Sequence, residues 1–259
     1  MIMSERRPER DPIVIAIGGT GANEKVVEDY YSHLVEVSAP DVANSNKLFA
    51  LENGGLQLLQ ATYDELKDRV RRFRRQNVGR KVIVLGHSQG GVHAARLGVD
   101  RQADAVVTLA APIRGGVTEG LPSLGDPEIA RMLEEELSPE SAFMMDLNER
   151  MEKRWPRGVP LHVISAGMGD IVVPQTSQYG VNLPGNQAPR EFVVAPPFSD
   201  WLGGDIGARR LVGAQEHTEI IAHKHAVGHF MIPRAEGLPG HLRALADELH
   251  PDARYRRVA

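Results

Sequence analysis

The chain has 259 residues, of which 42% are hydrophobic and 25% charged, a composition typical of a single globular domain. Its formal net charge of -4 gives no general electrostatic reason to expect nucleic acid or an anionic membrane as a partner. The absence of cysteine excludes disulfides, thiolate zinc sites and a cysteine nucleophile.

The first residues, MIMSERRPERDP, are polar and charged, whereas a signal peptide has an apolar core after its basic residues. No stretch approaches the roughly 18 apolar residues of a membrane span. We therefore expect a flexible tail over residues 1–12, one domain over 13–259, no stable membrane insertion and a cytoplasmic location.

Strands and helices alternate from the start of this domain. Residues 13–17, IVIAI, are continuously apolar and β-branched, the pattern of a strand buried on both faces, and lead into the turn GGTGAN. A helix is expected over about 24–35, a strand over 47–51 and a helix over 57–76, where apolar residues recur near helical spacing.

The next segments continue the alternation. KVIVL at 81–85 reads as a strand, VHAARLG at 92–98 as a helix and AVVTLAAP at 105–112 as a buried strand. Strands that alternate with helices predict a mostly parallel sheet, here of about six strands, with helices on both faces.

Residues 113–158 interrupt this rhythm. Two dipeptides, Asp-Pro at 126 and Ser-Pro at 138, each place an N-cap residue before a proline suited to the first helical position. We expect two helices, over about 127–137 and 139–153, that form a small cap above the carboxyl ends of the strands.

The sheet is expected to resume with PLHVISA at 160–166 and to continue with EFVVA near 191 and TEIIA near 218. Most of the chain between 179 and 215 is rich in glycine and proline, which predicts loop.

The segment GHSQG at 86–90 matches G-x-S-x-G, in which a strand turns sharply into a helix and presents a strained serine. Side chains at the two glycine positions would collide in such a turn. Because a strand precedes the motif and a helix-compatible run follows it, the pattern favours Ser88 as a nucleophile over a serine in a structural turn.

A nucleophilic serine needs a base within hydrogen-bond reach and an acid that orients the base. In this kind of site the acid and then the histidine follow the serine in the chain. Asp170 fits because it directly follows a predicted strand and precedes IVVP, although a carboxylate that caps a turn is the alternative. Asp146, in a cap helix, and Asp200 and Asp205, in the uncertain loop, fit less well.

Five histidines follow this candidate acid before the end of the last predicted helix. His229, in HAVGHFMIP, lies in a short loop after the predicted strand near 218, where a base can reach the edge of the sheet, and His225 is its main competitor. His217 and His241 are expected at the surface, at the start of a strand and of the last helix. His223, His225 and His229 have spacing that also suits a metal, but carboxylates of the usual ligand patterns do not accompany them.

The reaction also needs two N–H donors aimed at the developing oxyanion. We expect the amide of Gln89, directly after the serine, and an amide of GGTG at 18–21, with Thr20 as the favoured donor. The same turn begins like a dinucleotide-binding fingerprint, but Glu24 stands where that motif requires glycine or alanine.

These residues resemble the α/β-hydrolase superfamily, and within it bacterial lipase-like and esterase-like members. The resemblance runs over nearly the whole chain, through IVIAIGGTG, LGHSQGG, AAPIRG, LSPESAFMMDLN, ISAGMGDIVVP and AVGHFMIP. It implies a compact α/β-hydrolase fold in which Ser88 is the nucleophile, Asp170 the acid and His229 the base, with the Thr20 and Gln89 amides as the oxyanion hole.

Two features depart from the family's pattern. Gly18 and Gly19 stand where members often have His-Gly. The segment from Asp170 to His229 is also longer than a minimal member needs, which suggests that 176–215 is an insertion that shapes the pocket.

The sequence therefore predicts a serine hydrolase that cleaves a carboxylic ester through an acyl-enzyme, without a metal or organic cofactor. Its substrate would be a small molecule or an acyl group on a carrier; no oligomeric state is predicted. The alternatives are an intracellular thioesterase, acyltransferase or cyclase, or a non-catalytic ligand-binding protein on the same fold. Apolar residues of the predicted cap either line an acyl site or, for most of them, pack its helices: Leu121, Ile129, Leu133, Phe143, Met144, Met145 and Met151.

Overall fold

The structure is a computed structural model in which the following residues are described: 11–51, 55, 57–117, 127–166, 170, 172–179, 181–185, 187–195, 219–222 and 229–250. Residues 1–10 of the predicted tail and residues 196–215 of the predicted insertion lie outside these ranges.

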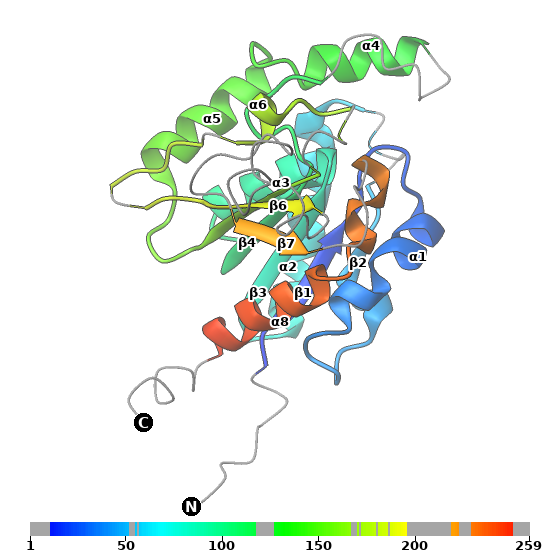
Figure 1. Ribbon diagram of the computed structural model, residues 1–259, viewed down its shortest axis with the longest axis vertical. Coiled ribbons are helices and arrows are strands. Elements are labelled where there is room, and N and C mark those ends of the chain that lie inside the picture. The colour runs from blue at the N-terminus through cyan, green and yellow to red at the C-terminus, as the bar shows by residue number, and fades with distance from the viewer. Residues whose placement is uncertain are drawn as a thin grey trace, which may run out of the picture.

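A parallel sheet forms the centre of the molecule (Figure 1). Its strand order is β2-β1-β3-β4-β5-β6-β7, and each neighbouring pair is parallel. The predicted mostly parallel sheet is confirmed, with the two-residue β2 at its edge. The strands are β1 (Ile13–Ile17), β2 (Leu48–Phe49), β3 (Val82–His87), β4 (Ala105–Leu109), β5 (Leu161–Ser165), β6 (Arg190–Ala195) and β7 (Glu219–Ala222).

Helices lie on both faces of the sheet, as predicted. They are α1 (Glu24–Val35), α2 (Leu59–Gln76), α3 (Gln89–Val99), α4 (Pro127–Glu136), α5 (Ala142–Arg154), α6 (Gln175–Gln178) and α8 (Leu238–Leu249), with short 3-10 helices η2 (Asn44–Lys47) and η6 (His229–Arg234). None of these helices, in the described part of the chain, combines the length and apolar character needed to cross a membrane.

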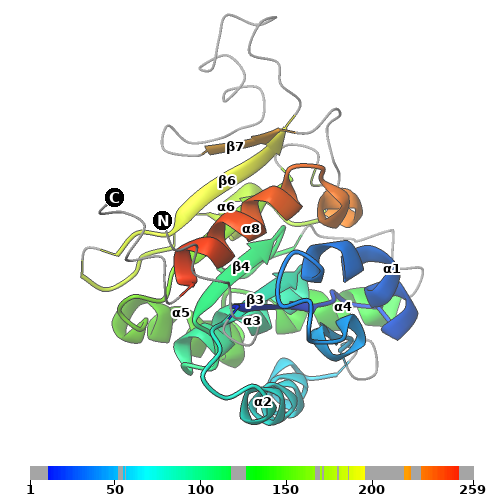
Figure 2. The same ribbon diagram turned by 90° about the horizontal axis from the view of Figure 1, so that it is seen from below.

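Alternate residues of each central strand enter different hydrophobic cores, because successive side chains of a strand point to opposite faces. Ile13 and Ile15 of β1 pack in the same core as α2, α3 and α5, whereas Val14 and Ala16 pack with α1 and α8. The two views in Figures 1 and 2 show α2 and α8 on different sides of the strands. The continuous apolar run of β1 therefore reflects burial on both faces.

The strand order of the sheet reverses at β1. From β1 it adds β2 on one side, and it then returns to add β3 to β7 on the other side. In open parallel sheets, the crevice outside the carboxyl ends at such a switch point is the usual place for a ligand site. The loop after β1 and the turn after β3 meet at this crevice.

The two helices expected in the cap region are present, but α5 begins later than predicted. Ser141, rather than Ser138, is its N-cap, and the Ser141 Oγ accepts a hydrogen bond of 3.3 Å from the Met144 N–H. The Ser138 hydroxyl instead bonds to Glu140, the residue after Pro139. The Ser-Pro dipeptide at 138 therefore marks a turn that precedes the helix.

The two cap-region helices have different surroundings. Phe143, Met144 and Met151 of α5 are buried in the main core, while Met145 is 58% exposed. The α4 helix ends at Glu136, whose carboxylate accepts a hydrogen bond of 2.9 Å from the Leu59 N–H at the start of α2. Leu121 and the side chain of Ile129 lie outside the described part of the chain.

Burial is the main cause that lowers the pKa of four histidines: to about 3 for His87, His93 and His162, and to about 4 for His241. His93 on α3 stacks on Tyr63 with 6.3 Å between ring centroids, and neither of its ring nitrogens has a hydrogen-bond partner among the described residues. Burial therefore favours the neutral form of these side chains.

We therefore predict that the free energy of unfolding falls as the pH drops below about 6.5, the pKa of histidine in an unfolded chain. Because the pKa values in the folded protein are lower, the unfolded state takes up protons first between about pH 6.5 and 4. Urea unfolding measured across this range tests the prediction. His93→Leu removes one of these groups and should make the slope shallower, by at most about 1.4 kcal/mol per pH unit. Equal slopes in the two proteins would contradict it.

Candidate active site

Ser88 occupies a strained turn between β3 and α3. Its backbone has φ 54° and ψ -127°, a region that a residue with a side chain adopts only when its surroundings impose it. The Ser88 N–H donates a 2.9 Å hydrogen bond to the carbonyl of Leu109 at the end of β4. The neighbouring strand thus holds the serine in this conformation.

Both glycines of the motif are required by close approaches of the backbone. A Cβ on Gly86 would lie 2.2 Å from the carbonyl oxygen of Gly90. A Cβ on Gly90 would lie 2.4 Å from the carbonyl oxygen of Gly18. The first contact lies within the turn itself, between Gly86 and Gly90. The second packs the turn against Gly18, in the loop that follows β1.

Gln89 is the first residue of α3, so its backbone N–H has no acceptor within the helix. Its fully buried side chain accepts a 2.7 Å hydrogen bond from the Thr20 hydroxyl and donates one of 3.1 Å to the carbonyl of Gly55. The sequence pattern indicated only the backbone N–H of Gln89 as a functional group. In the structure, its amide group also ties the loop after β1 to the start of α3.

Asp170 and His229 form a buried pair, although 59 residues separate them in the sequence. The Nδ1 of His229 lies 3.1 Å from each carboxylate oxygen of Asp170, and the two side chains are 2% and 0% exposed. An ionised carboxylate only accepts hydrogen bonds, so Nδ1 carries the proton and Nε2 of the neutral ring is left with a free lone pair.

Three further donors fix the carboxylate of Asp170. Its Oδ1 accepts hydrogen bonds from the backbone N–H groups of Val172, at 3.0 Å, and Val173, at 2.8 Å. Its Oδ2 accepts one of 3.1 Å from the side-chain amide of Gln178 in α6. Gln178 is a supporting residue that no sequence pattern marked, because it reaches Asp170 only through the fold of the loop after β5.

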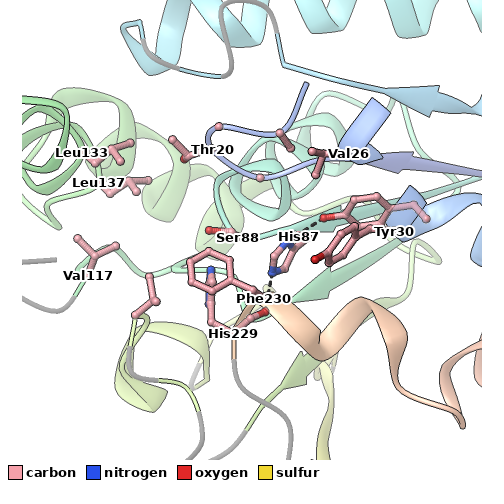
Figure 3. A pocket seen from close by; sticks show the side chains of 15 residues that line it. Thr20, Val26, Tyr30, His87, Ser88, Val117, Leu133, Leu137, His229 and Phe230 are labelled. Atoms are coloured by element: carbon pink, nitrogen blue, oxygen red, sulfur yellow. Dashed lines mark hydrogen bonds between the residues drawn. The ribbon is translucent and has the colours of Figure 1, made fainter. Parts of the chain in front are cut away.

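Ser88, Thr20 and His229 line one cavity of about 280 Å³ (Figure 3). The side chains of Ser88 and His229 are not joined by a hydrogen bond in this structure. Hydrogen bonds between catalytic groups are often long without substrate and shorten in the reacting complex. The structure thus brings the predicted serine, histidine and loop residue to one cavity, with the carboxylate directly behind the histidine.

The cavity has two apolar walls. Figure 3 shows Val117, Leu133 and Leu137 on one side of Ser88, and Val26 and Tyr30 on the other. Among the described residues that line it there is no lysine, arginine, aspartate or glutamate. Of the apolar cap residues singled out in the sequence whose side chains the structure describes, Leu133 is the one that lines this cavity.

Two weaker candidates have other partners. Asp146 on α5 forms ion pairs with Arg96 and Arg150. His241 is half-buried rather than at the surface as expected, and its Nε2 lies 2.9 Å from Nδ1 of His162. The other candidates lie outside the described residues: Asp200, Asp205, His217, His223 and His225. Within the described part of the chain, no three metal-ligating side chains are grouped to hold an ion.

Comparisons with known proteins agree with this fold. Residues 27–255 match the model of the alpha/beta hydrolase family. The search of curated proteins gives no match. Three solved structures share the fold at low sequence identity.

Phospholipase PlaB from Legionella pneumophila has a TM-score of 0.52 and 13% identity, over 95% of this chain and 63% of that protein. Est1E from Butyrivibrio proteoclasticus has a TM-score of 0.54 and 15% identity, over 93% and 89%. Lipase B from Aspergillus fumigatus has a TM-score of 0.53 and 16% identity, over 95% and 54%. The chain thus spans less than two thirds of PlaB and about half of lipase B. The family match over most of the chain shows that this protein belongs to the alpha/beta hydrolase family.

Proposed function

We propose that the protein is a serine hydrolase that cleaves a carboxylic ester through an acyl-enzyme. The observation that carries the proposal is the buried Asp170–His229 pair, whose histidine shares a cavity with the strained Ser88. Membership of the hydrolase family supports the same class of reaction.

In the proposed first step, Nε2 of His229 takes the proton of the Ser88 hydroxyl while Oγ attacks the ester carbonyl carbon. The carbonyl oxygen becomes an oxyanion, which the backbone N–H groups of Gln89 and Thr20 stabilise. Asp170 stabilises the positive charge on His229. The tetrahedral intermediate then breaks its bond to the alcohol oxygen, and His229 returns the proton to the departing alcohol.

Water completes the cycle. His229 removes a proton from a water molecule as the water oxygen attacks the acyl-enzyme carbonyl. A second tetrahedral intermediate then releases the acid, and Ser88 recovers its proton from His229. The side-chain tie between Thr20 and Gln89 supports this proposal because it holds the two loops that carry the expected oxyanion donors at a fixed separation.

The lining of the cavity favours an uncharged, apolar acyl group. Val117, Leu133 and Leu137 form a continuous apolar wall beside Ser88, and no charged side chain among the described lining residues would pair with an ionic substrate. A cavity of about 280 Å³ is near the lower end of the range of ligand pockets, about 300 to 1,000 Å³. We therefore infer that short esters are better substrates than long ones.

We predict that Ser88→Ala and His229→Ala each lower kcat/KM for a short p-nitrophenyl ester by at least about 1,000-fold, since the triad works as a unit. Asp170→Asn should lower kcat by about 10,000-fold, because the amide favours the wrong tautomer of the histidine. Hydrolysis and labelling of the serine by a fluorophosphonate measure these losses.

The matched control is His225→Ala, in the same segment as the proposed base, which should keep its activity. Wild-type protein that neither reacts with the fluorophosphonate nor cleaves the ester series would refute the proposed function. Full activity of His229→Ala would refute the assignment of the base.

We also predict that Leu133→Trp shifts the preference towards shorter acyl chains, because the larger ring fills part of the apolar wall. Each methylene group that no longer fits loses about 0.8 kcal/mol, roughly fourfold in kcat/KM. A series of p-nitrophenyl esters of increasing acyl length measures the shift. Met145→Trp, on the 58% exposed position of α5, is the control and should leave the profile unchanged. An equal loss for acetyl and longer esters in Leu133→Trp would contradict an acyl-binding wall.

A further inference from the structure

His87, the residue before the serine, has both ring nitrogens engaged although its side chain is almost completely buried. Its Nε2 lies 2.9 Å from the main-chain carbonyl oxygen of His229, and its Nδ1 lies 2.8 Å from the hydroxyl of Tyr31 (Figure 3). These contacts link residues 142 and 56 positions apart. The proposed reaction steps do not involve this side chain.

The chemistry of the two partners fixes the tautomer of His87. A carbonyl oxygen only accepts, so Nε2 of His87 carries the proton and donates it to His229. Nδ1 is then unprotonated and accepts from the Tyr31 O–H. Burial raises the pKa of Tyr31, which keeps that hydroxyl protonated, and burial together with the nearby His229 lowers the pKa of His87 to about 3.

Tyr31 also connects this pair to the loop after β1. Gly19, which directly precedes Thr20, lies close enough to the Tyr31 hydroxyl for its backbone to offset part of the burial that raises the pKa of Tyr31. The loop packs closely here, because a Cβ on Gly19 would lie 3.0 Å from the Cβ of Ser88 and 3.4 Å from Nδ1 of His87. The Tyr31 hydroxyl thus contacts the ring of His87 and lies near the proposed oxyanion loop.

The rings of His87 and His229 are in contact, with 4.9 Å between their centroids and 40° between their planes. In the proposed reaction His229 becomes an imidazolium. A cation at position 87 would oppose that charge at this short distance, whereas a neutral imidazole does not. The fixed neutral tautomer therefore suits a neighbour of the base.

We propose that His87, held in one tautomer by Tyr31, is a positioning residue that fixes the main chain of His229 and thereby keeps its imidazole between Asp170 and Ser88. The inference rests on the proposed function, since it concerns the orientation of the same base. His87 itself exchanges no proton with the substrate.

The test compares His87→Leu, which removes both hydrogen bonds, with His87→Gln, which keeps a donor and an acceptor on one planar group. His87→Leu should lower kcat about 100-fold with little change in KM, because a misplacement of a reacting group by about 1 Å costs this much. His87→Gln should recover most of the loss. A folded His87→Leu with wild-type kcat, a loss confined to KM, or a folded His87→Gln as slow as His87→Leu would each overturn the proposal.

His93→Leu is the matched control. It makes the same substitution in the same segment at an equally buried histidine, whose ring nitrogens have no partners among the described residues. Its kcat should stay at the wild-type level. Thermal unfolding of each variant separates loss of the fold from loss of positioning.

Tyr31→Phe keeps the inference testable if His87→Leu does not fold. It should lower kcat in the wild-type background, because Nδ1 of His87 loses its donor. In a folded His87→Leu background, where the link is already broken, it should add no further loss, since residues in one network are not additive. In the His87→Gln background, which keeps an acceptor for the Tyr31 hydroxyl, it should lower kcat again. A full, independent loss in the His87→Leu background, or wild-type kcat in Tyr31→Phe alone, would overturn the proposed link.

Imidazole ¹H–¹⁵N spectra give a readout that does not need turnover. Wild-type protein should show His87 protonated at Nε2 only, and a His229 Nδ1–H signal that is kept in His87→Gln and shifted or lost in His87→Leu. An unchanged His229 signal in a folded His87→Leu overturns the positioning role. Retention of ester hydrolysis by Ser88→Ala would instead overturn the proposed function, so the two failures are distinguishable.

Discussion

The close approach of Gly90 to the loop after β1 is the constraint on which the rest of the site depends. A side chain at Gly90 would meet the carbonyl oxygens of Gly18 and Ile17 at 2.4 and 2.7 Å, so the turn after β3 and the end of β1 lie in direct backbone contact. This contact arises because β1 and β3 are neighbours in the sheet although the chain visits β2 between them. It places Thr20 beside Gln89 and sets the serine at the mouth of the crevice between the strands.

The parts of this arrangement that could be predicted are those encoded by local patterns. The apolar run of β1, the strand before Ser88 and the glycines of the turn are each contained in a short segment, and the order serine, acid, histidine pointed to Asp170 and His229. The start of α5 was predicted at the wrong serine, because Ser138, unlike Ser141, is followed by a proline suited to the first helical position. The Ser138 hydroxyl accepts its hydrogen bond from the Glu140 N–H, and the Ser141 hydroxyl accepts one from the Met144 N–H inside the helix.

Contacts between distant segments explain what the sequence did not reveal. No local pattern distinguishes the side chain of Gln89 from that of any polar residue at the start of a helix, yet its partners lie on the loop of Thr20 and at Gly55. His241 was expected at the surface, at the start of the last helix, but the fold places it against His162 of β5. Pairings of this kind depend on how helices pack on the sheet, which no single segment determines.

The hydrogen bond from the Leu59 N–H to the carboxylate of Glu136 has a consequence for how substrate preference can change. It fastens the end of α4, and with it the wall formed by Leu133 and Leu137, to the scaffold helix α2, whereas the serine, carboxylate and histidine are supported by β3, α6 and α1. In the proposed function, substrate recognition and chemistry therefore rest on separate supports. Natural variation or laboratory evolution can then reshape the wall on α4 while the proposed reacting groups keep their geometry, which makes this helix a suitable place to diversify the proposed substrates.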